Sequence, residues 1–248
     1  DWSSACALPI CRRITPGRRP RHTDFTAVER LEARHALAAT FTSGAWTITG
    51  DDDPGRPDDT IVIERNPLNA RQLRATVNGQ VVDVRSAARV KSIRVIAGAG
   101  DDSISVNVPG ASGLATRLEG GFGNDVISGG DGPDTILGGP GRDTINGRGG
   151  DDDLYGNGGQ DALAGSLGDD DLHGGAGIDT IRGGAGHNTL DGGRAVDSLF
   201  GEAGRDVARL EDGERLVGNE STNPLTPVGD AARLKSWAID RKSTRLNS

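Results

Sequence analysis

The residues best suited to chemistry in this 248-residue chain are aspartates that recur every nine residues across residues 120–209. Each closes a glycine-rich phrase, and the full period reads G-G-x-G-x-D-x-U-x, where U is a large aliphatic residue. The glycines permit positive φ, which lets backbone carbonyls turn toward a common point. The carboxylate adds an anionic oxygen, and Ca²⁺ takes roughly six to eight oxygen ligands. The spacing therefore indicates a fold built around a metal, with calcium the expected ion.

Ten copies of the phrase follow one another without a change of phase. Glycine occupies position one in all ten copies and position four in nine, with Ala195 the exception. Position six is Asp except at Asn188, and position eight is Ile or Leu except at Ala208. Position two also carries Arg148, Asn157, Ser166 and Glu202. Such regularity argues against flexible Gly- and Asp-rich sequence, although a solenoid that stands without metal is a further alternative.

The phrase resembles the RTX (repeats-in-toxin) family of hemolysin-type calcium-binding repeats, and the resemblance covers about a third of the chain. It implies an all-β fold, a right-handed parallel β-roll or β-solenoid, in which six residues form a calcium-binding turn and three a short strand. Two repeats then make one coil. A degenerate copy at residues 98–104, GAGDDSI, lies out of register upstream.

With two strands per coil, repeats two apart stack on the same edge of the roll. The metal ligands expected on one edge are Asp125, Asp143, Asp161, Asp179 and Asp197. Those expected on the other edge are Asp134, Asp152, Asp170, Asn188 and Asp206. If each Ca²⁺ lies between adjacent turns on one edge, up to about eight ions bind. The two pairs that include Asn188 should be weakest, because they offer one carboxylate fewer.

The charge of the repeat block predicts that the metal is needed for folding. Fifteen Asp and Glu202 stand against six Arg, a net charge of −10, and the carboxylates line up on two edges. Glycine-rich chain also loses more conformational freedom on folding than other sequence. We therefore expect a block that is unfolded or loosely collapsed without calcium and folded with it.

The composition of the chain limits the classes of partner that can be expected. Aromatic residues make up 3 %, 39 residues are Gly, and the net charge is −8, which fits a thin solenoid rather than a large conventional core. Acidic charge excludes nucleic acid and anionic membrane surfaces as expected partners, and no stretch is long and apolar enough for a membrane span. A cell-surface or matrix partner is compatible with this composition. Cys6 and Cys11 suit either a disulfide or a metal site.

Four regions are expected along the chain. Residues 1–40 form a basic leader with a short helix at 25–40, whose run VERLEARHALAA resembles the LEPR-XLL motif of some exported bacterial proteins, with Ala33 replacing Pro and Ala36 replacing Leu. That resemblance implies export and cleavage near Ala39; an amphipathic helix is the alternative. Residues 41–118 form a β-rich cap with the degenerate repeat, 119–209 the roll, and 210–248 a C-terminal cap or tail with a helix at 230–239. The sequence contains no Met, so we expect a processed product or a fragment.

The cap is read from six apolar or alternating segments, at residues 45–49, 60–64, 73–77, 80–84, 90–96 and 103–108. The dipeptide Asn78-Gly79 between the third and fourth predicts a two-residue hairpin turn.

No catalytic motif accompanies the repeats. The sequence contains neither G-x-S-x-G nor H-E-x-x-H, and we expect its four histidines, at 22, 35, 173 and 187, to be solvated surface residues. We therefore expect a secreted, extracellular, non-catalytic calcium-binding module with a structural or adhesive role. The alternative is a calcium-dependent segment of a larger secreted hydrolase whose catalytic domain is absent from this chain.

Overall fold

A computed structural model describes residues 39–50, 58–209, 215–216 and 226–228, all within the unit His35–Ser248. Most of the helix expected at 25–40, the helix expected at 230–239 and both cysteines lie outside these residues. Ala39 and Thr40, at the end of the first of those helices, instead begin a strand.

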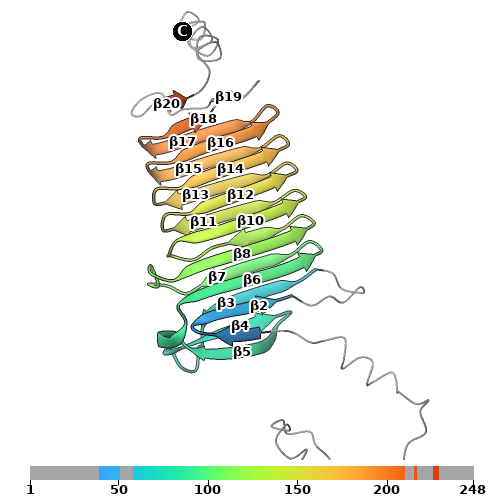
Figure 1. The fold of residues 1–248 in the computed structure, drawn as a ribbon, viewed down its shortest axis with the longest axis vertical. Helices are drawn as coiled ribbons and strands as arrows, with labels where there is room; N and C mark the ends of the chain where they lie inside the picture. Colours follow the sequence, from blue (N-terminus) through green and yellow to red (C-terminus); the bar gives the residue numbers. More distant parts are fainter. Residues whose placement is uncertain (1–38, 51–57, 210–214, 217–225, 229–248) are drawn as a thin grey trace, which may run out of the picture. The chain divides into compact units, whose positions relative to one another are not determined.

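Two sheets of ten strands each build the roll (Figure 1). Sheet A contains, in spatial order, β1 (Ala39–Thr42), β2 (Ala45–Thr49), β6 (Ser92–Ala99), β8 (Ala115–Phe122), β10 (Asp134–Pro140), β12 (Asp153–Gly158), β14 (Asp171–Ala176), β16 (Thr189–Arg194), β18 (Val207–Arg209) and β20 (Thr226–Val228). Sheet B contains β5 (Gln80–Ser86), β4 (Gln72–Val77), β3 (Thr60–Arg65), β7 (Ser103–Asn107), β9 (Val126–Ser128), β11 (Thr144–Gly149), β13 (Ala162–Leu167), β15 (Thr180–Gly186), β17 (Ser198–Gly204) and β19 (Arg215–Leu216).

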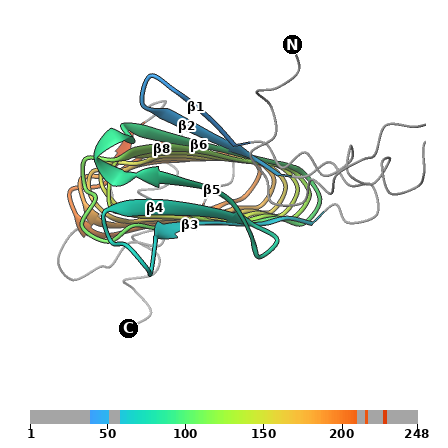
Figure 2. The ribbon, with the colours of Figure 1, turned by 90° about the horizontal axis from the view of Figure 1, so that it is seen from below.

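From β6 onward, successive strands alternate between the two sheets, so each coil gives one strand to each face (Figure 2). From β8 to β18, neighbouring strands of a sheet pair in parallel with a shift of 18 residues, as in Ile136↔Leu154 and Ile145↔Leu163. This arrangement confirms the all-β parallel β-roll. Most strands are longer than the three residues that the resemblance implies. They continue through positions one to three of the next repeat, where Gly139 still pairs with Asn157.

Position eight of the repeat supplies the core. Its side chains point between the sheets, and all are at most 1 % exposed: Ile127, Ile136, Ile145, Leu154, Leu163, Leu172, Ile181, Leu190, Leu199 and Ala208. The same apolar layer continues upstream through β2, β3, β6 and β7. Since positions seven and nine face outward, a strand with a single buried side chain suffices for a roll this thin.

The segment upstream of the repeats continues the same ladder. Strands β2, β6 and β8 pair in parallel in sheet A, as do β3, β7 and β9 in sheet B. Strands β1, β4 and β5 add antiparallel partners at this end. The predicted hairpin joins β4 to β5, and Asn78 and Gly79 both take positive φ, 51° and 76°. All six strands expected here are present, with small changes in their bounds.

Among the residues that the structure describes, no helix is long and apolar enough to cross a membrane.

Candidate calcium-binding turns

The aspartates of position six form two columns, one along each edge of the roll. We call the edge that carries Asp125 the first edge and the edge that carries Asp134 the second edge. Within a column, the backbone N–H of each position-six residue up to Asn188 donates to Oδ1 of the residue 18 positions later, for example from Asp125 to Asp143 at 2.8 Å. The other pairs repeat this bond at 2.8–3.0 Å. The ten predicted ligands are thus brought together in the two expected columns, and each is at most 2 % exposed.

The second carboxylate oxygen is the unusual feature of these columns. Oδ2 is buried and has no hydrogen-bond partner in seven of the repeat aspartates: Asp125, Asp143, Asp152, Asp161, Asp170, Asp179 and Asp197. A buried polar atom of this kind costs roughly 1–3 kcal/mol, and more when it is charged. Two rows of such oxygens therefore call for a bound cation.

The pKa values of these carboxyls respond to the same environment. Burial raises the pKa of Asp143 to about 7 and that of Asp152 to about 8. Burial also raises the pKa of Asp170 and Asp179 to about 6. The backbone hydrogen bonds lower these values in part, while neighbouring carboxylates of the column raise them further. At neutral pH a nearby cation would stabilise the charged form.

Glycines complete the turns by bringing backbone carbonyls to the same edge. At position four, Gly159 has φ +146°, and a Cβ there would lie 1.5 Å from the carbonyl oxygen of Gly141 in the preceding turn. At position two, a Cβ on Gly139 would lie 1.9 Å from the oxygen of Gly121. At position one, a Cβ on Gly138 would lie 2.2 Å from Oδ2 of Asp143. A side chain at these three glycines would collide with a carbonyl or carboxylate oxygen, so the carbonyls and the unpaired carboxylate oxygens lie close together in these turns.

The donor set of these turns consists of oxygen atoms. Among the residues that the structure describes, no three His, Cys, Asp or Glu side chains converge on one point. A cation between two turns would therefore draw on backbone carbonyls together with the carboxylates. Hard oxygen donors of this mixed kind suit Ca²⁺, and the residues present fit that ion.

Comparison with known families agrees with this geometry. The model of the RTX calcium-binding nonapeptide repeat, in four copies, matches residues 112–145, 128–163, 137–172, 164–199 and 173–208. Residues 112–208 are RTX calcium-binding repeats. The chain is accordingly a calcium-binding repeat protein, and the matching family is one of binding repeats rather than of a catalytic domain. No curated protein and no solved structure matches the chain.

The RTX turns are not all alike. Both oxygens of Asp134 are hydrogen-bonded: Oδ1 accepts from Oγ1 of Thr116 at 2.7 Å and Oδ2 from the N–H of Gly130 at 2.6 Å. Asn188 keeps the ladder bond from Asp170 but offers an amide in place of a carboxylate. Its Nδ2 donates to Oδ1 of Asp206 at 3.0 Å. These two turns differ from the other RTX turns in what they offer a cation.

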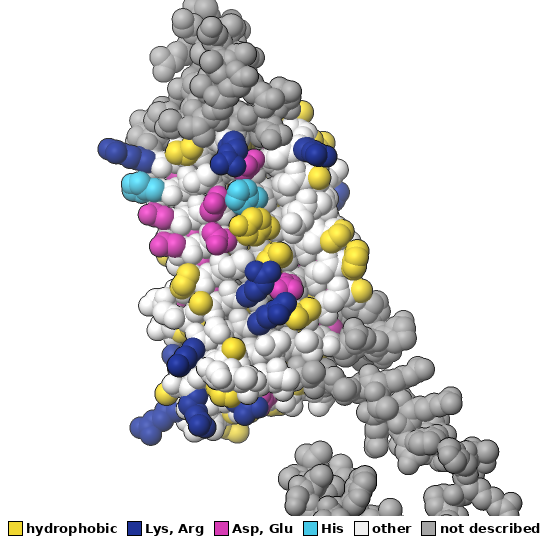
Figure 3. All heavy atoms as spheres, in the orientation of Figure 1, with side chains coloured by type: hydrophobic (Ala, Val, Ile, Leu, Met, Phe, Trp, Pro, Cys, Tyr) yellow, Lys and Arg dark blue, Asp and Glu magenta, His cyan; other side chains and the backbone are white. Residues whose placement is uncertain are grey.

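The outer surfaces of the two edges also differ (Figure 3). At position five the second edge carries Asp151 and Asp169, and both raise the pKa of the buried Asp170. The first edge instead exposes Phe122, Ile178 and Val196. The second edge is therefore the more strongly negative of the two at its surface.

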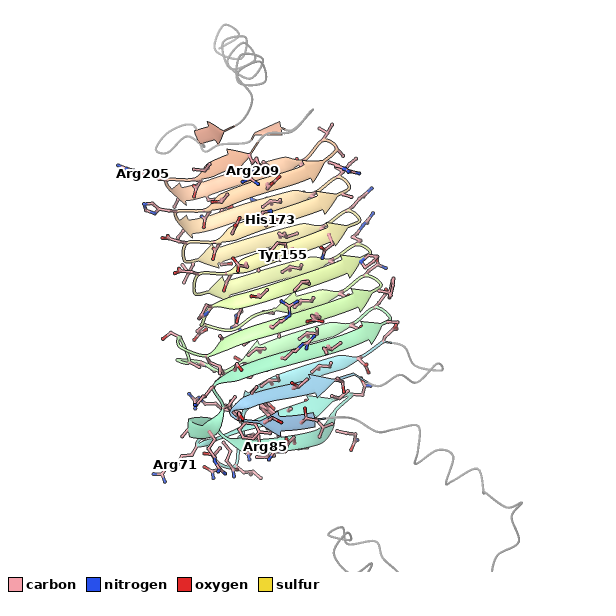
Figure 4. The ribbon with its side chains drawn as sticks, viewed as in Figure 1. Arg71, Arg85, Tyr155, His173, Arg205 and Arg209 are labelled. Carbon is pink, nitrogen blue, oxygen red and sulfur yellow. The ribbon has the colours of Figure 1, made fainter. Side chains whose placement is uncertain are left out.

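The two described histidines lie on the outer surface, away from position six. His173 stacks on Tyr155 with ring centroids 5.0 Å apart, and its Nε2 lies 3.1 Å from Oδ1 of Asp171 (Figure 4). The side chain of His187 is 65 % exposed and lies 3.7 Å from Asp169. The first is half-buried against its neighbours, and only the second is solvated in the way expected of both.

Asp102 is a further buried carboxylate of this kind that the nonapeptide pattern does not include. Its carboxyl is 2 % exposed, its Oδ2 is buried without a hydrogen-bond partner, and burial raises its pKa to about 6. The signal in the sequence is the degenerate copy at residues 98–104.

Proposed function

We propose that this chain is a secreted, non-catalytic module whose RTX roll folds when Ca²⁺ binds between stacked turns outside the cell. The folded roll then serves a structural or adhesive role toward a cell surface or matrix. The observation that carries this proposal is the pair of columns of buried carboxylates, in which one oxygen of each of seven repeat aspartates lacks a partner.

Physical chemistry links the metal to folding. Each unpaired oxygen opposes folding while its carboxyl is charged and no cation is present. A bound Ca²⁺ contributes its binding free energy to the folded state alone, because the unfolded chain does not bring the donors together. In the RTX family, low calcium inside the cell keeps the repeats unfolded for secretion, and higher calcium outside folds them. The acidic chain, with a net charge of −8, fits this role.

The four regions expected from the sequence have different roles. In our proposal, residues 1–40 are a leader associated with export, 41–118 cap the roll, 119–209 bind calcium, and 210–248 form the C-terminal cap or tail. Hydrogen bonds and apolar packing hold the described strands of the 41–118 region, and the degenerate copy adds a repeat-like turn whose hydrogen bonds extend to Asp125 on one side and Asp59 on the other.

The proposal is tested by hydrogen exchange of the whole chain at submicromolar and at millimolar calcium. We expect the amides of residues 120–209 to exchange freely at low calcium and to become protected together at high calcium. In the variant Asp161→Ala, protection should require more calcium. The turn that carries Asp161 borders two gaps, and its carboxylate would serve the ion in each of them. Protection that is the same at both calcium concentrations would contradict metal-coupled folding.

The surface role needs a separate test on the producing cells. We expect the chain in the cell-surface fraction when calcium is present, and we expect a chelator to release it into the medium. Retention inside the cells at all calcium concentrations would contradict the secreted role.

A further inference from the structure

We propose that the calcium column of the first edge begins one turn before the nonapeptide repeats, in the gap between the turn of residues 97–102 and the turn of residues 120–125. Asp102 and Asp125 supply its carboxylates. This inference rests on the proposed function, since it assigns one more site to the same ion. The nonapeptide phase does not reveal it, because the two aspartates are 23 residues apart instead of 18.

The hydrogen bonds across this gap match those inside the repeats. The N–H of Asp102 donates to Oδ1 of Asp125 at 2.8 Å, as the N–H of Asp125 donates to Oδ1 of Asp143 at 2.8 Å. The N–H of Val126 donates to the carbonyl of Asp102 at 2.8 Å, the bond that Thr144 makes to Asp125. Oδ2 of Asp102 remains buried and unpaired.

The backbone carbonyls of the turn also take the positions found in the repeats. A Cβ on Gly121 would lie 1.8 Å from the oxygen of Gly98, and a Cβ on Gly123 would lie 1.9 Å from that of Gly100. One turn later the corresponding distances are 1.9 Å, from Gly139 to Gly121, and 1.8 Å, from Gly141 to Gly123. Gly98 and Gly100 have φ of 123° and 132°, as the glycines of the repeats do. The gap thus presents the same carbonyl and carboxylate oxygens as its neighbours.

The five additional residues of this coil lie between β7 and β8, on the second edge. There the loop meets the turn of residues 129–134: a Cβ on Gly132 would lie 2.5 Å from the oxygen of Leu114, and the N–H of Gly110 donates to Asp131 at 2.8 Å. In this turn Gly130 and Gly132 do not take the positive φ that positions two and four have in the nine other repeats.

The first gap of the second edge, between the turns of residues 129–134 and 147–152, is therefore poorly suited to an ion. Hydrogen bonds occupy both oxygens of Asp134. The guanidinium of Arg148 donates to the carbonyl oxygens of Val106, at 3.2 Å, and Gly129, at 3.4 Å. The guanidinium thus lies against the backbone of the turn of residues 129–134, where burial raises the pKa of Asp134 and the charge of Arg148 lowers it in part. We therefore expect no calcium ion in this gap.

The test compares three single substitutions by counting the ions bound to the intact chain in native mass spectrometry at a fixed free calcium concentration. Asp102→Asn removes one carboxylate of the new site but keeps an acceptor for the N–H of Asp59, as Asn188 does for Asp170. Asp101→Asn is the matched control. It removes the same charge one residue away, and Asn124 shows that asparagine accepts the position-five hydrogen bond. Asp134→Asn removes the aspartate that the nonapeptide phase assigns to a site.

We expect Asp102→Asn to bind at least one Ca²⁺ fewer than the wild-type chain, and the other two variants to bind the wild-type number. An unchanged count in Asp102→Asn, or a loss in Asp134→Asn alone, would overturn the inference and leave calcium binding by the repeats intact. A wild-type chain that binds no calcium would defeat the proposed function as well. If Asp102→Asn fails to fold, calcium-induced hydrogen-exchange protection of residues 97–102 in the wild-type chain decides, and its absence overturns the inference.

Discussion

Two adjacent glycines in the fifth repeat should differ sharply in their tolerance of a side chain. Gly158 occupies position three and Gly159 position four. A Cβ on Gly158 would meet nothing within 4 Å, and its backbone is outside the positive-φ region. A Cβ on Gly159 would lie 1.5 Å from the carbonyl oxygen of Gly141, and Gly159 has φ +146°. The same substitution, glycine to alanine, therefore probes open space at one residue and the stacked carbonyls at the next.

The magnitude follows from the two penalties at Gly159. Holding a non-glycine residue at this φ costs on the order of 1–3 kcal/mol. The contact with Gly141 adds to this, because the clashing atom belongs to the backbone of a packed ladder and must move. We expect Gly159→Ala to lower the free energy of unfolding by about 3 kcal/mol, or roughly 100-fold in the folding equilibrium constant. Gly158→Ala should stay within about 0.5 kcal/mol of the wild-type chain.

The assay is urea unfolding at saturating calcium, followed by far-UV circular dichroism, together with calorimetric calcium titration of each variant. Because the carbonyl of Gly141 borders the gap between two turns, Gly159→Ala should also weaken calcium binding, whereas Gly158→Ala should not. Equal unfolding midpoints and equal calcium affinities for the two variants would refute the close stacking of carbonyls on which the site geometry depends.

Three further outcomes are expected. The pKa of Asp143 is raised to about 7 and that of Asp152 to about 8, so the metal-free folded roll binds more protons than the unfolded chain between about pH 4 and pH 8. The stability of the metal-free roll is therefore greatest at the acidic end of this range and is lost as the pH rises. Chelator-treated protein should gain β-structure by circular dichroism when the pH is lowered from 8 to 5. Calcium-loaded protein should instead lose calcium affinity over the same range, because protons compete for the carboxylates. No acid-induced gain would contradict the buried carboxylates. Ala195, at φ +110°, should give a roll about 1 kcal/mol more stable when replaced by Gly, measured as a higher Tm in calcium, and a lower Tm would contradict the strain. Asn188→Asp should lower the calcium concentration at the folding midpoint by supplying a carboxylate to two gaps of the second edge, and an unchanged midpoint would contradict shared sites.

Much of the roll could be predicted from the sequence because the residues within each repeat determine its strand and its turn. The aliphatic residue at position eight specifies the buried side of every strand, and Asn78-Gly79 specifies a hairpin through its tolerance of positive φ. The placement of the position-six residues in two columns follows from the even spacing of the strands. Each of these features depends on a short segment of chain, so the local sequence pattern is enough to predict it.

The exceptions arise where a site depends on two turns at once. Asp134 stands in a perfect copy of the phrase, yet Thr116 occupies the place that an aspartate would take one coil earlier and bonds to its carboxylate. Asp102 breaks the phase because the connection between β7 and β8 is longer, although its turn stacks on the repeats as they stack on each other. The sequence pattern identifies the residues of one turn. Which residues face them from the neighbouring turn is decided by how the coils stack in the fold.

Metal-coupled folding of the roll is tested most directly by a calcium titration of the whole chain, with circular dichroism and binding heat measured on the same samples and magnesium as the control. We expect a cooperative gain of β-structure that tracks the uptake of several Ca²⁺ ions and is absent with Mg²⁺, which prefers fewer ligands in a stricter geometry. A β-rich spectrum that neither calcium nor chelator changes would contradict it, because the roll would then stand without the metal that its buried carboxylates call for.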